Sequence, residues 1–488
     1  MRGGGGAGGG GAGAGGGGGG GTVGGDAPDL AAPTPVTPPP VDGGVTPPPV
    51  QALDPEIATI LGQVSATNLA NDVATLVGFV TRNSCSDNSG GASHPHGIGA
   101  ARDWLAQQLG ADGLTVKLDA YSQSCPNGAQ TDHNVVAWLP GKGHPDRIIL
   151  IGGHYDSRTT GVSDGTSAAP GANDSGSQTS LVLEAARVLA GHSFDATLVF
   201  VAFAGEEQGL VGSKNLAQGY RQYFSPSATV EAVLNCDIVG GDSSVNDATT
   251  LQQFRLYSPG TPREVTAPDG TSDDTSPARG LMRYVGYWGA GYLPSMTIVP
   301  KLREDRPGRG GDHESFLDQG YPGVRFIEAM ESPNAGTTAS HQHSPNDLAS
   351  FITPEYTARV ARVVIATAAS LARAPTPPQS LAVSAGGGGT LMASWTAPAS
   401  GPTVDHYVLA GRDVAENFYR ARVVVSGGAT ARTVTTTELG LGGATAFFVS
   451  VAAVDAAGHE SLFAYPELRC AGGSCVVPAG ANDVTAKN

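Results

Sequence analysis

The sequence predicts an α/β protein in which a mostly parallel central sheet has helices on both faces, followed by an all-β sandwich. Three continuous apolar runs, RIILIGG, TLVFVAFA and VEAVLNC, are typical of parallel strands that are buried on both faces. The segment QTSLVLEAARVLA between the first two runs repeats apolar residues at the spacing of one helix face. After residue 373 the helical pattern ends, and short segments alternate apolar and polar residues between turns, which predicts antiparallel strands.

The N-terminal segment has a composition that favours disorder. Residues 1–21 are almost entirely Gly with a few Ala, and residues 26–50 are rich in Pro. Such sequence cannot bury apolar area, so we expect residues 1–52 to form a disordered tether. No apolar segment follows Met1 and Arg2, as it would in a secretory signal. A Gly-rich tether is nevertheless what we expect directly after a cleaved signal or a lipid anchor.

The three apolar runs end next to side chains that can bind metals. His154 and Asp156 follow the first run, Glu206 and Glu207 follow the second, and Asp237 follows the third. Ligands bind at the carboxyl ends of strands in open parallel sheets, so we expect these side chains to converge on one crevice. Two neighbouring glutamates can supply one metal ligand and one proton carrier at the same place.

Two further segments add candidate ligands. Asp174 lies just before the predicted helix, where capping of the helix N-terminus is an alternative role for its side chain. His341 and His343 lie in HQHSPNDL, after the strand-like segment GVRFIEA. Carboxylates mixed with imidazoles, without clustered Cys, favour Zn²⁺ or a similar divalent ion in a catalytic site. One shared carboxylate such as Asp174 could bridge two such ions.

Five motifs, HYDS, GANDSGS, AGEEQGL, LNCDIVG and HSPND, occur in the order found in the M28 family of co-catalytic zinc peptidases, which the chain resembles over residues 55–372. The resemblance implies a zinc peptidase domain, assigned to residues 53–373, with two zinc ions per chain. His343 fits the family motif better than His341, because the family histidine precedes a Thr/Ser-Pro-x-Asp sequence. The implied metal ligands are His154 and Asp237 for one ion, Glu207 and His343 for the other, and Asp174 between them. The implied catalytic residues are Glu206, the general base, and Asp156, which orients the ring of His154.

The resemblance also implies an activity, the hydrolysis of peptide bonds at the N-terminus of a peptide or protein substrate, through a zinc-bridging water and Glu206. A carboxypeptidase of the same family is an alternative, which Arg303, Arg306 and Arg309 keep open because arginine would bind a free carboxylate. A glutaminyl cyclase, which works with one zinc, and a catalytically silent binding or adhesion protein are further alternatives.

Two regions near these motifs are less informative. Asp312 and His313, in the segment REDRPGRGGDHESF, are expected to shape the pocket or to form hydrogen bonds near the site. Residues 242–300 contain no pattern that predicts a role, although loops over a sheet edge usually shape a substrate pocket.

Composition limits the partners and the location. The formal net charge of −16 and the pI near 5.0 disfavour nucleic acid, whose binding depends on clustered Lys and Arg. No stretch approaches the roughly 20 apolar residues that would span a membrane. Disulfides between Cys85 and Cys125 and between Cys470 and Cys475 would leave Cys236 as a buried free thiol, although Cys470 and Cys475 could also be unpaired. Disulfides persist in oxidising compartments, so we expect a secreted or cell-envelope-attached protein.

Residues 374–469 resemble a fibronectin type III module, which is an immunoglobulin-like sandwich. Trp395 and Tyr407 stand where that family places its core Trp and a strand Tyr. We expect both rings to be core residues and residues 470–488 to be a C-terminal tail. Such modules act as spacers or adhesion units, so contact with insoluble polymer or the cell envelope is expected through this module.

Overall fold

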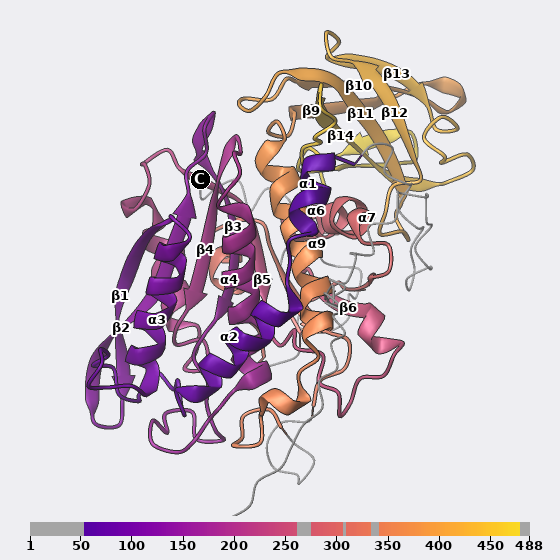
Figure 1. Ribbon diagram of the computed structural model, residues 1–488. Helices are drawn as coiled ribbons and strands as arrows, with labels where there is room; N and C mark the ends of the chain where they lie inside the picture. The colour runs from indigo at the N-terminus through magenta and orange to yellow at the C-terminus, as the bar shows by residue number, and fades with distance from the viewer. Residues whose placement is uncertain (1–52, 261–274, 306–308, 333–340, 479–488) are drawn as a thin grey trace, which may run out of the picture.

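The structure, a computed structural model, describes residues 53–260, 275–305, 309–332 and 341–478 (Figure 1). The tether predicted at residues 1–52 lies outside the described residues, and so does Arg306. The described chain forms an α/β unit, drawn in indigo to orange, followed by an all-β unit, drawn in orange to yellow. The predicted fold class is confirmed in both parts.

Eight strands form the sheet of the α/β unit, in the order β1-β2-β4-β3-β5-β8-β6-β7. The neighbours β4, β3, β5 and β8 run parallel, as do β6 and β7, whereas β1 with β2, β2 with β4 and β6 with β8 are antiparallel. The sheet is therefore mixed, with its main parallel part in the middle. The strands are β1 (Thr115–Cys125), β2 (Gly128–Leu139), β3 (His144–His154), β4 (Ala196–Phe203), β5 (Thr229–Cys236), β6 (Gln253–Tyr257), β7 (Thr297–Lys301) and β8 (Gly323–Glu328).

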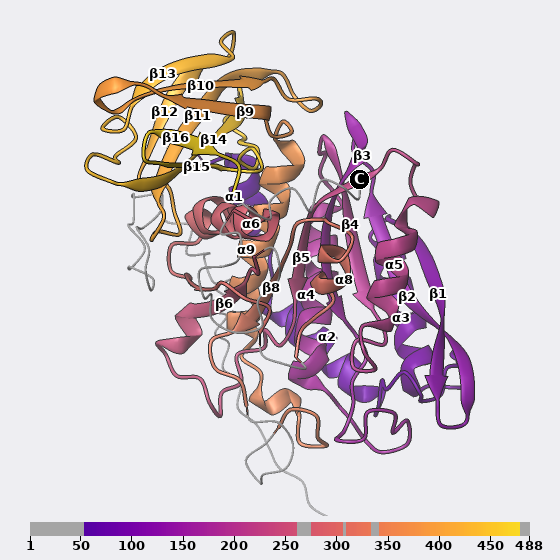
Figure 2. The ribbon, with the colours of Figure 1, turned by 180° about the vertical axis from the view of Figure 1, so that it is seen from behind.

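Helices cover both faces of this sheet. The face seen in Figure 1 carries α2, α3, α4 and α9, and the face seen in Figure 2 carries α5 and α8. The helices are α1 (Pro55–Leu61), α2 (Ala66–Gly78), α3 (Gly97–Ala111), α4 (Gln178–Leu189), α5 (Val211–Gly219), α6 (Pro277–Tyr284), α7 (Ala290–Tyr292), α8 (His313–Leu317) and α9 (Pro354–Arg373). The short helices are η1 (Ala172–Ser177), η2 (Tyr220–Gln222), η3 (Thr250–Gln252), η4 (Val285–Gly289), η5 (Ala349–Phe351) and η6 (Gly387–Gly389).

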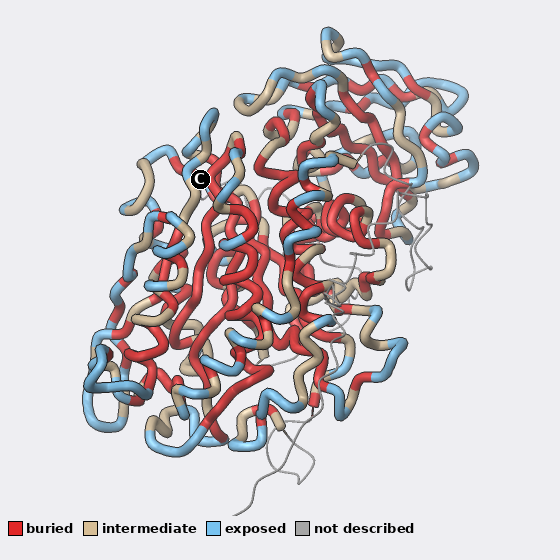
Figure 3. Tube along the Cα trace, viewed as in Figure 1, coloured by how far each residue is buried: buried red, intermediate tan, exposed pale blue. Residues whose placement is uncertain are grey.

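Burial on both faces explains why the central strands are continuous apolar runs. Every residue of β4 is buried, and Figure 3 shows the central strands in red. Successive side chains of a strand point to opposite faces, so Leu198 and Phe200 join one hydrophobic core while Val199 and Val201 join the other. A strand that is buried on both faces needs no polar face, which is why these runs are largely apolar and the metal-binding side chains come where the strands end.

The all-β unit consists of two antiparallel sheets with a hydrophobic core between them. Trp395 and Tyr407 belong to this core, and their rings meet edge to face with centroids 5.2 Å apart. The resemblance to a fibronectin type III module stays a prediction. One sheet has the order β13-β10-β9 and the other β12-β11-β14-β15-β16, so strands continue beyond residue 469. The strands are β9 (Gln379–Ala385), β10 (Thr390–Thr396), β11 (Val404–Asp413), β12 (Ala421–Ser426), β13 (Ala431–Thr435), β14 (Ala446–Asp455), β15 (Leu468–Ala471) and β16 (Ser474–Val476).

The two units are packed together through α6 and the segment that follows it. Phe418 of the all-β unit belongs to the main hydrophobic core of the α/β unit. Its ring lies against the backbone of Gly286, where a Cβ would be 2.4 Å from a ring carbon. Arg283 donates from Nε to the carbonyl of Asn417 over 2.9 Å. The all-β unit is therefore part of the packed structure rather than a separate module on a linker.

Both predicted disulfides are present. Cys85 pairs with Cys125, Cys470 pairs with Cys475, and Cys236 is a buried free thiol. The first bond joins the segment before α3 to the end of β1, and the second closes the β15–β16 hairpin. None of the described helices has the length and the apolar character that crossing a membrane requires.

Candidate active site

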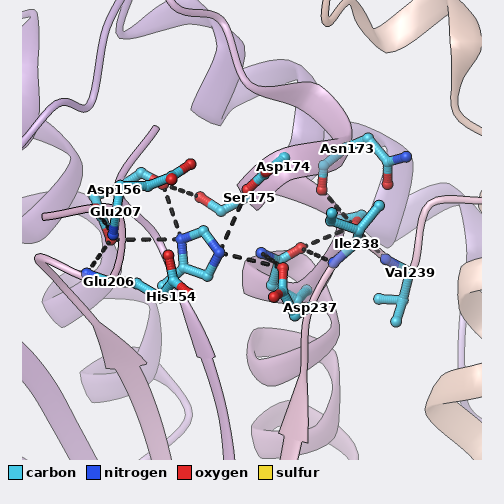
Figure 4. Close-up of polar contacts among 12 residues, drawn as sticks. His154, Asp156, Asn173, Asp174, Ser175, Glu206, Glu207, Asp237, Ile238 and Val239 are labelled. Atoms are coloured by element: carbon cyan, nitrogen blue, oxygen red, sulfur yellow. Dashed lines mark hydrogen bonds and ion pairs between the residues drawn. The ribbon is translucent and has the colours of Figure 1, made fainter. Parts of the chain in front are cut away.

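The candidate site lies where the central parallel strands end (Figure 4). His154 is the last residue of β3, Glu206 and Glu207 follow β4, and Asp237 directly follows β5. The strands β4, β3 and β5 are parallel neighbours, so their carboxyl ends meet at one edge of the sheet. The structure therefore brings these side chains from three separate runs into one place.

Asp174 is shared by two groups of side chains that could each hold a metal ion. His154, Asp174 and Asp237 form one group, and Asp174, Glu207 and His343 form the other; within each, the candidate ligand atoms lie within 4.8 Å of one another. His154 Nε2 is 3.4 Å from Asp174 Oδ1 and 3.3 Å from Asp237 Oδ1. His343 Nε2 is 3.0 Å from Asp174 Oδ2 and 3.2 Å from Glu207 Oε1. Each oxygen of Asp174 faces a different group.

His341 lies outside both groups. Its Nδ1 is 3.0 Å from Asp242 Oδ2, and its ring stacks on Phe351 with centroids 3.7 Å apart. His343, two residues later, faces Asp174 instead. The structure therefore favours His343 over His341 as a metal ligand.

The position of Asp174 depends on the segment that carries His343. The carboxylate of Asp347 accepts hydrogen bonds from the backbone N–H groups of Asn173, over 2.8 Å, and Asp174, over 2.9 Å. Gln342 Nε2 donates to Asp174 Oδ2 over 3.0 Å. The carboxylate of Asp174 makes no capping hydrogen bond to a helix within the described chain, so the capping alternative is not supported. The sequence contained Asp347 within the HSPND motif but did not indicate this role.

Asp156 connects His154 to the two glutamates. The backbone N–H groups of Glu206 and Glu207 lie 3.3 and 3.2 Å from the two carboxylate oxygens of Asp156 and donate to them. Asp156 Oδ1 is 3.4 Å from His154 Nδ1, and the carbonyl oxygen of Asp156 is 3.1 Å from the same nitrogen. The ring is therefore held on its Nδ1 side, which leaves Nε2 directed at Asp174 and Asp237. Outer contacts of this kind fix the orientation of a metal-binding histidine.

The donors in the two groups fit zinc. Asp174 Oδ1 and Glu207 Oε1 are buried and make no hydrogen bond to the described residues. Buried polar atoms are nearly always hydrogen-bonded, so such oxygens indicate a further partner. Imidazole nitrogens and carboxylate oxygens are both established zinc ligands. A cation in each group would be bound by these oxygens together with the histidine nitrogens that lie 3.2 and 3.4 Å from them.

Charges inside the site shift its pKa values in opposite directions. Burial opposes the ionisation of Asp174, but the hydrogen bond and charge of His343 hold the pKa of Asp174 far below its usual value. Burial also opposes the protonation of His343, yet the charges of Glu207 and Asp174 raise its pKa to about 10. Burial raises the pKa of Glu206 well above its usual value, against the opposing charge of His154. Each of the two adjacent glutamates thus interacts with a different histidine, Glu207 with His343 and Glu206 with His154.

Two arginines contact the carboxylates of Glu207 and Asp237, which we call the outer carboxylates, and neither arginine was identified from the sequence. Arg158 donates from Nε to Glu207 Oε2 over 2.5 Å. Arg325 of β8 donates from Nη2 to Asp237 Oδ2 over 2.6 Å and from Nη1 to Asp305 Oδ2 over 3.1 Å. Burial opposes the ionisation of Asp237, but the charge of Arg325 lowers the pKa of that carboxyl to about 2. The sequence did contain an indication that Arg325 has a charged partner. It is a charged residue inside the apolar run GVRFIEA, and a charge that is buried in a strand requires a partner.

The site opens into a cleft of about 480 Å³ whose lining is mainly polar. Beyond the two ligand groups, Glu304, Glu314, Arg309 and Lys214 line it. Arg309 forms an ion pair with Glu331 over 2.5 Å. The cleft therefore contains carboxylates as well as cations that could meet a substrate terminus.

Asp312 and His313 are buried at the start of α8. Burial raises the pKa of Asp312 to about 7, against the opposing charge of His154. Residues 242–300, which the sequence left without a role, supply β6 and β7 of the sheet as well as α6 at the contact with the all-β unit. The predicted roles of Asp312 and His313 in shaping the pocket stay predictions.

Known proteins resemble this chain in sequence. The model of peptidase family M28 matches residues 134–368. A probable zinc metalloprotease of Pyrenophora teres f. teres is 37% identical over 361 residues, which are 69% of this chain and 72% of that protein. The chain belongs to peptidase family M28. It is therefore a zinc-dependent metallopeptidase, and the predicted resemblance to the M28 family is confirmed.

Solved structures with a similar fold include the LapA aminopeptidase of Legionella pneumophila. It has a TM-score of 0.47 and 20% identity, over 66% of this chain and 75% of that one. A glutaminyl cyclase of Porphyromonas gingivalis has a TM-score of 0.45 and 19% identity, over 62% of this chain and 98% of that one. M28 membership implies zinc, and the donors described above are the residues of this chain that fit it.

Proposed function

We propose that this M28 peptidase is an exopeptidase that removes residues from the N-terminus of peptides, an aminopeptidase that uses two zinc ions. The observation that carries the proposal is the position of Asp174, whose two oxygens face two separate groups of donors. Two-metal hydrolytic sites hold their ions close together, and a shared carboxylate suits that spacing. Two ions rather than one also favour a peptidase over a glutaminyl cyclase.

Glu206 is the proposed general base. When bound, zinc would polarise the scissile carbonyl and make hydroxide available near neutral pH. The side chain of Glu206 lines the cleft beside both ligand groups and belongs to neither. Its carboxylate takes a proton from the attacking water and delivers it to the leaving amine. Asp156 positions the backbone of Glu206 and the ring of His154 for this reaction.

The partners of the cleft arginines support an aminopeptidase over a carboxypeptidase. A substrate C-terminus would need a cation, and the cleft arginines Arg158, Arg309 and Arg325 each form an ion pair with a carboxylate of the protein itself. Lys214, the further cation of the lining, donates to the carbonyl of Gly209. The cleft lining also includes Glu304 and Glu314, and a carboxylate is the type of group that a free amine would meet. The sequence also indicated Arg303 and Arg306 as groups that could bind a substrate carboxylate. Arg303 is not among the residues that line this cleft, and Arg306 lies outside the described residues.

Mass spectrometry of products from a mixed peptide panel tests the proposal. The peptides are free or blocked at each terminus, and each is incubated with and without a zinc chelator. We expect chelator-sensitive loss of single N-terminal residues, which N-terminal blocking abolishes. Trimming from the C-terminus would support the carboxypeptidase. Loss of ammonia from N-terminal Gln would support the cyclase, and no change with zinc supplied would support the silent binding protein.

The protein is proposed to act outside the cytoplasm, secreted or attached to the cell envelope. The disulfides Cys85–Cys125 and Cys470–Cys475 support this, because such bonds persist in oxidising compartments. Contact of the C-terminal module with polymer or envelope is proposed on the analogy with adhesion modules alone. Fractionation of the producing cells, followed by detection of the chain in medium, envelope and cytoplasm, tests the location.

A further inference from the structure

The two outer carboxylates of the site share one arrangement. Glu207 directs Oε1 toward His343, at 3.2 Å, while its Oε2 accepts from Arg158 over 2.5 Å. Asp237 directs Oδ1 toward His154, at 3.3 Å, while its Oδ2 accepts from Arg325 over 2.6 Å. In each case one oxygen faces the ligand group and an arginine occupies the other.

We propose that Arg158 and Arg325 are positioning residues that restrict Glu207 and Asp237 to one ligand oxygen each. The inference rests on the proposed function, because it concerns zinc held in both groups. A carboxylate can bind a metal through one oxygen or through both. An oxygen that is already hydrogen-bonded to a guanidinium is not available as a second ligand. Each arginine would therefore preserve an open coordination position on the zinc ion.

An open position is what separates a catalytic zinc site from a structural one. Structural sites fill every position with protein ligands, whereas catalytic sites leave one for water or substrate. Each arginine also withdraws negative charge from the carboxylate it contacts, which makes that carboxylate a weaker donor to the metal. Loss of the arginine would therefore favour tighter, two-oxygen binding of the ion and slower catalysis. A residue that merely builds the ligand geometry would give the opposite result, which is loss of the metal.

The two arginines differ in how safely they can be replaced. Arg325 has 1% of its side chain exposed and also binds Asp305, so its removal would leave a second buried carboxylate without this cation. Arg158 has 19% of its side chain exposed, and its other described hydrogen bond goes to the carbonyl of Thr159. Arg158 is therefore the better site for a test.

The test uses the full chain loaded with zinc and compares the parent with Arg158→Met. X-ray absorption gives the number of oxygen ligands per zinc, and chelator competition with elemental analysis gives zinc retention. We expect zinc to be retained as in the parent, the mean number of oxygen ligands to rise, and kcat on a cleaved peptide to fall about 10–100-fold with little change in KM. The acid limb of the plot of kcat against pH should move to higher pH. Stronger donation from the carboxylate to zinc makes hydroxide harder to form.

Three further variants complete the design. Arg158→Lys keeps the cation and should recover parent-like coordination and part of kcat. Lys214→Met removes a positive charge from the same cleft without touching a ligand carboxylate, so its zinc coordination should match the parent. Arg158→Gln takes the place of Arg158→Met if thermal unfolding shows that the methionine variant is not folded, with the same expected coordination.

Two results would overturn the inference. One is loss of zinc from Arg158→Met, and the other is parent-like coordination and kcat in that variant. Failure of the proposed function looks different, since the parent would then bind zinc without trimming peptides or would bind no zinc. The coordination measurement needs no substrate, so it decides the role of Arg158 even if the cleavage assay fails.

Discussion

The two halves of the candidate site are built differently. His154 and Asp237 are buried and lie at the ends of β3 and β5, which are hydrogen-bonded neighbours in the sheet. Glu207 and His343 are only partly buried and lie in loops. Backbone hydrogen bonds fix the ends of strands, whereas a loop needs additional contacts to hold a side chain in place. The difference teaches that strand ends fix the backbone of one half, while the loop half and the shared Asp174 depend on contacts between loops, such as those of Asp347.

The largest expected effect comes from Glu206, which belongs to neither half. Glu206→Gln should retain zinc and lose turnover by roughly 10²–10⁴-fold, because the amide cannot accept the proton. Glu207→Gln, one residue away, should instead lose metal affinity. Steady-state kinetics with zinc analysis of both purified variants checks this contrast. Full activity of Glu206→Gln would exclude the residue as the base.

Replacing each of the two histidines with alanine directly tests the difference between the strand-end half and the loop half. His343→Ala should lose the ion of the loop half and keep the ion of the strand-end half, so about one zinc per chain should be measured by elemental analysis. His341→Ala is the matched control two residues away, and it should keep both ions because its ring contacts Asp242 and Phe351. Loss of zinc in the control would move the ligand assignment to His341.

Asp347 is expected to hold in place Asp174, the candidate ligand that both halves share. Asp347→Asn replaces one carboxylate oxygen that accepts from the backbone of Asn173 or Asp174 with an NH₂ group, which cannot accept. Zinc affinity should fall about 10–100-fold, as it does when outer contacts of metal ligands are removed. Chelator competition measures this change. Asp242→Asn is the control, since Asp242 contacts His341, and an equal loss there would contradict a specific role for Asp347.

The smallest expected effect lies far from both halves, at the contact between the two units. His459 bridges Asp54 and Asp455 with distances of 2.9 Å to each, and although burial opposes it, these carboxylates raise its pKa. A raised histidine pKa contributes stability that is fully present below the unfolded value of about 6.5 and is lost as pH rises through the folded value.

His459→Gln should therefore lower the melting temperature near pH 6 by about 2–4 °C and by less near pH 9, with turnover unchanged. Thermal unfolding at the two pH values measures the difference. A shift that is equal at both would show that packing, and not charge, holds this contact.

Much of this protein could be predicted from local sequence. Apolar runs such as that of β4 are continuous because both faces of the strand are buried, and their ends expose the first polar side chains. A candidate ligand at the end of such a run, as His154 and Asp237 are, has its backbone placed by the strand. The sequence also indicated a buried thiol at Cys236 and two cysteine pairs, but it left the pairing open, and the structure joins Cys85 to Cys125 across 40 residues.

The tertiary structure decided what depends on residues far apart in the chain. Arg158 meets Glu207 across 49 residues, Arg325 meets Asp237 across 88, and Asp347 meets the backbone of Asn173 across 174. No local pattern encodes such a pair, because each partner is satisfied only after the sheet has assembled. The packing of the all-β unit against α6, and the orientation that turns His343 toward the site and His341 away, arise for the same reason.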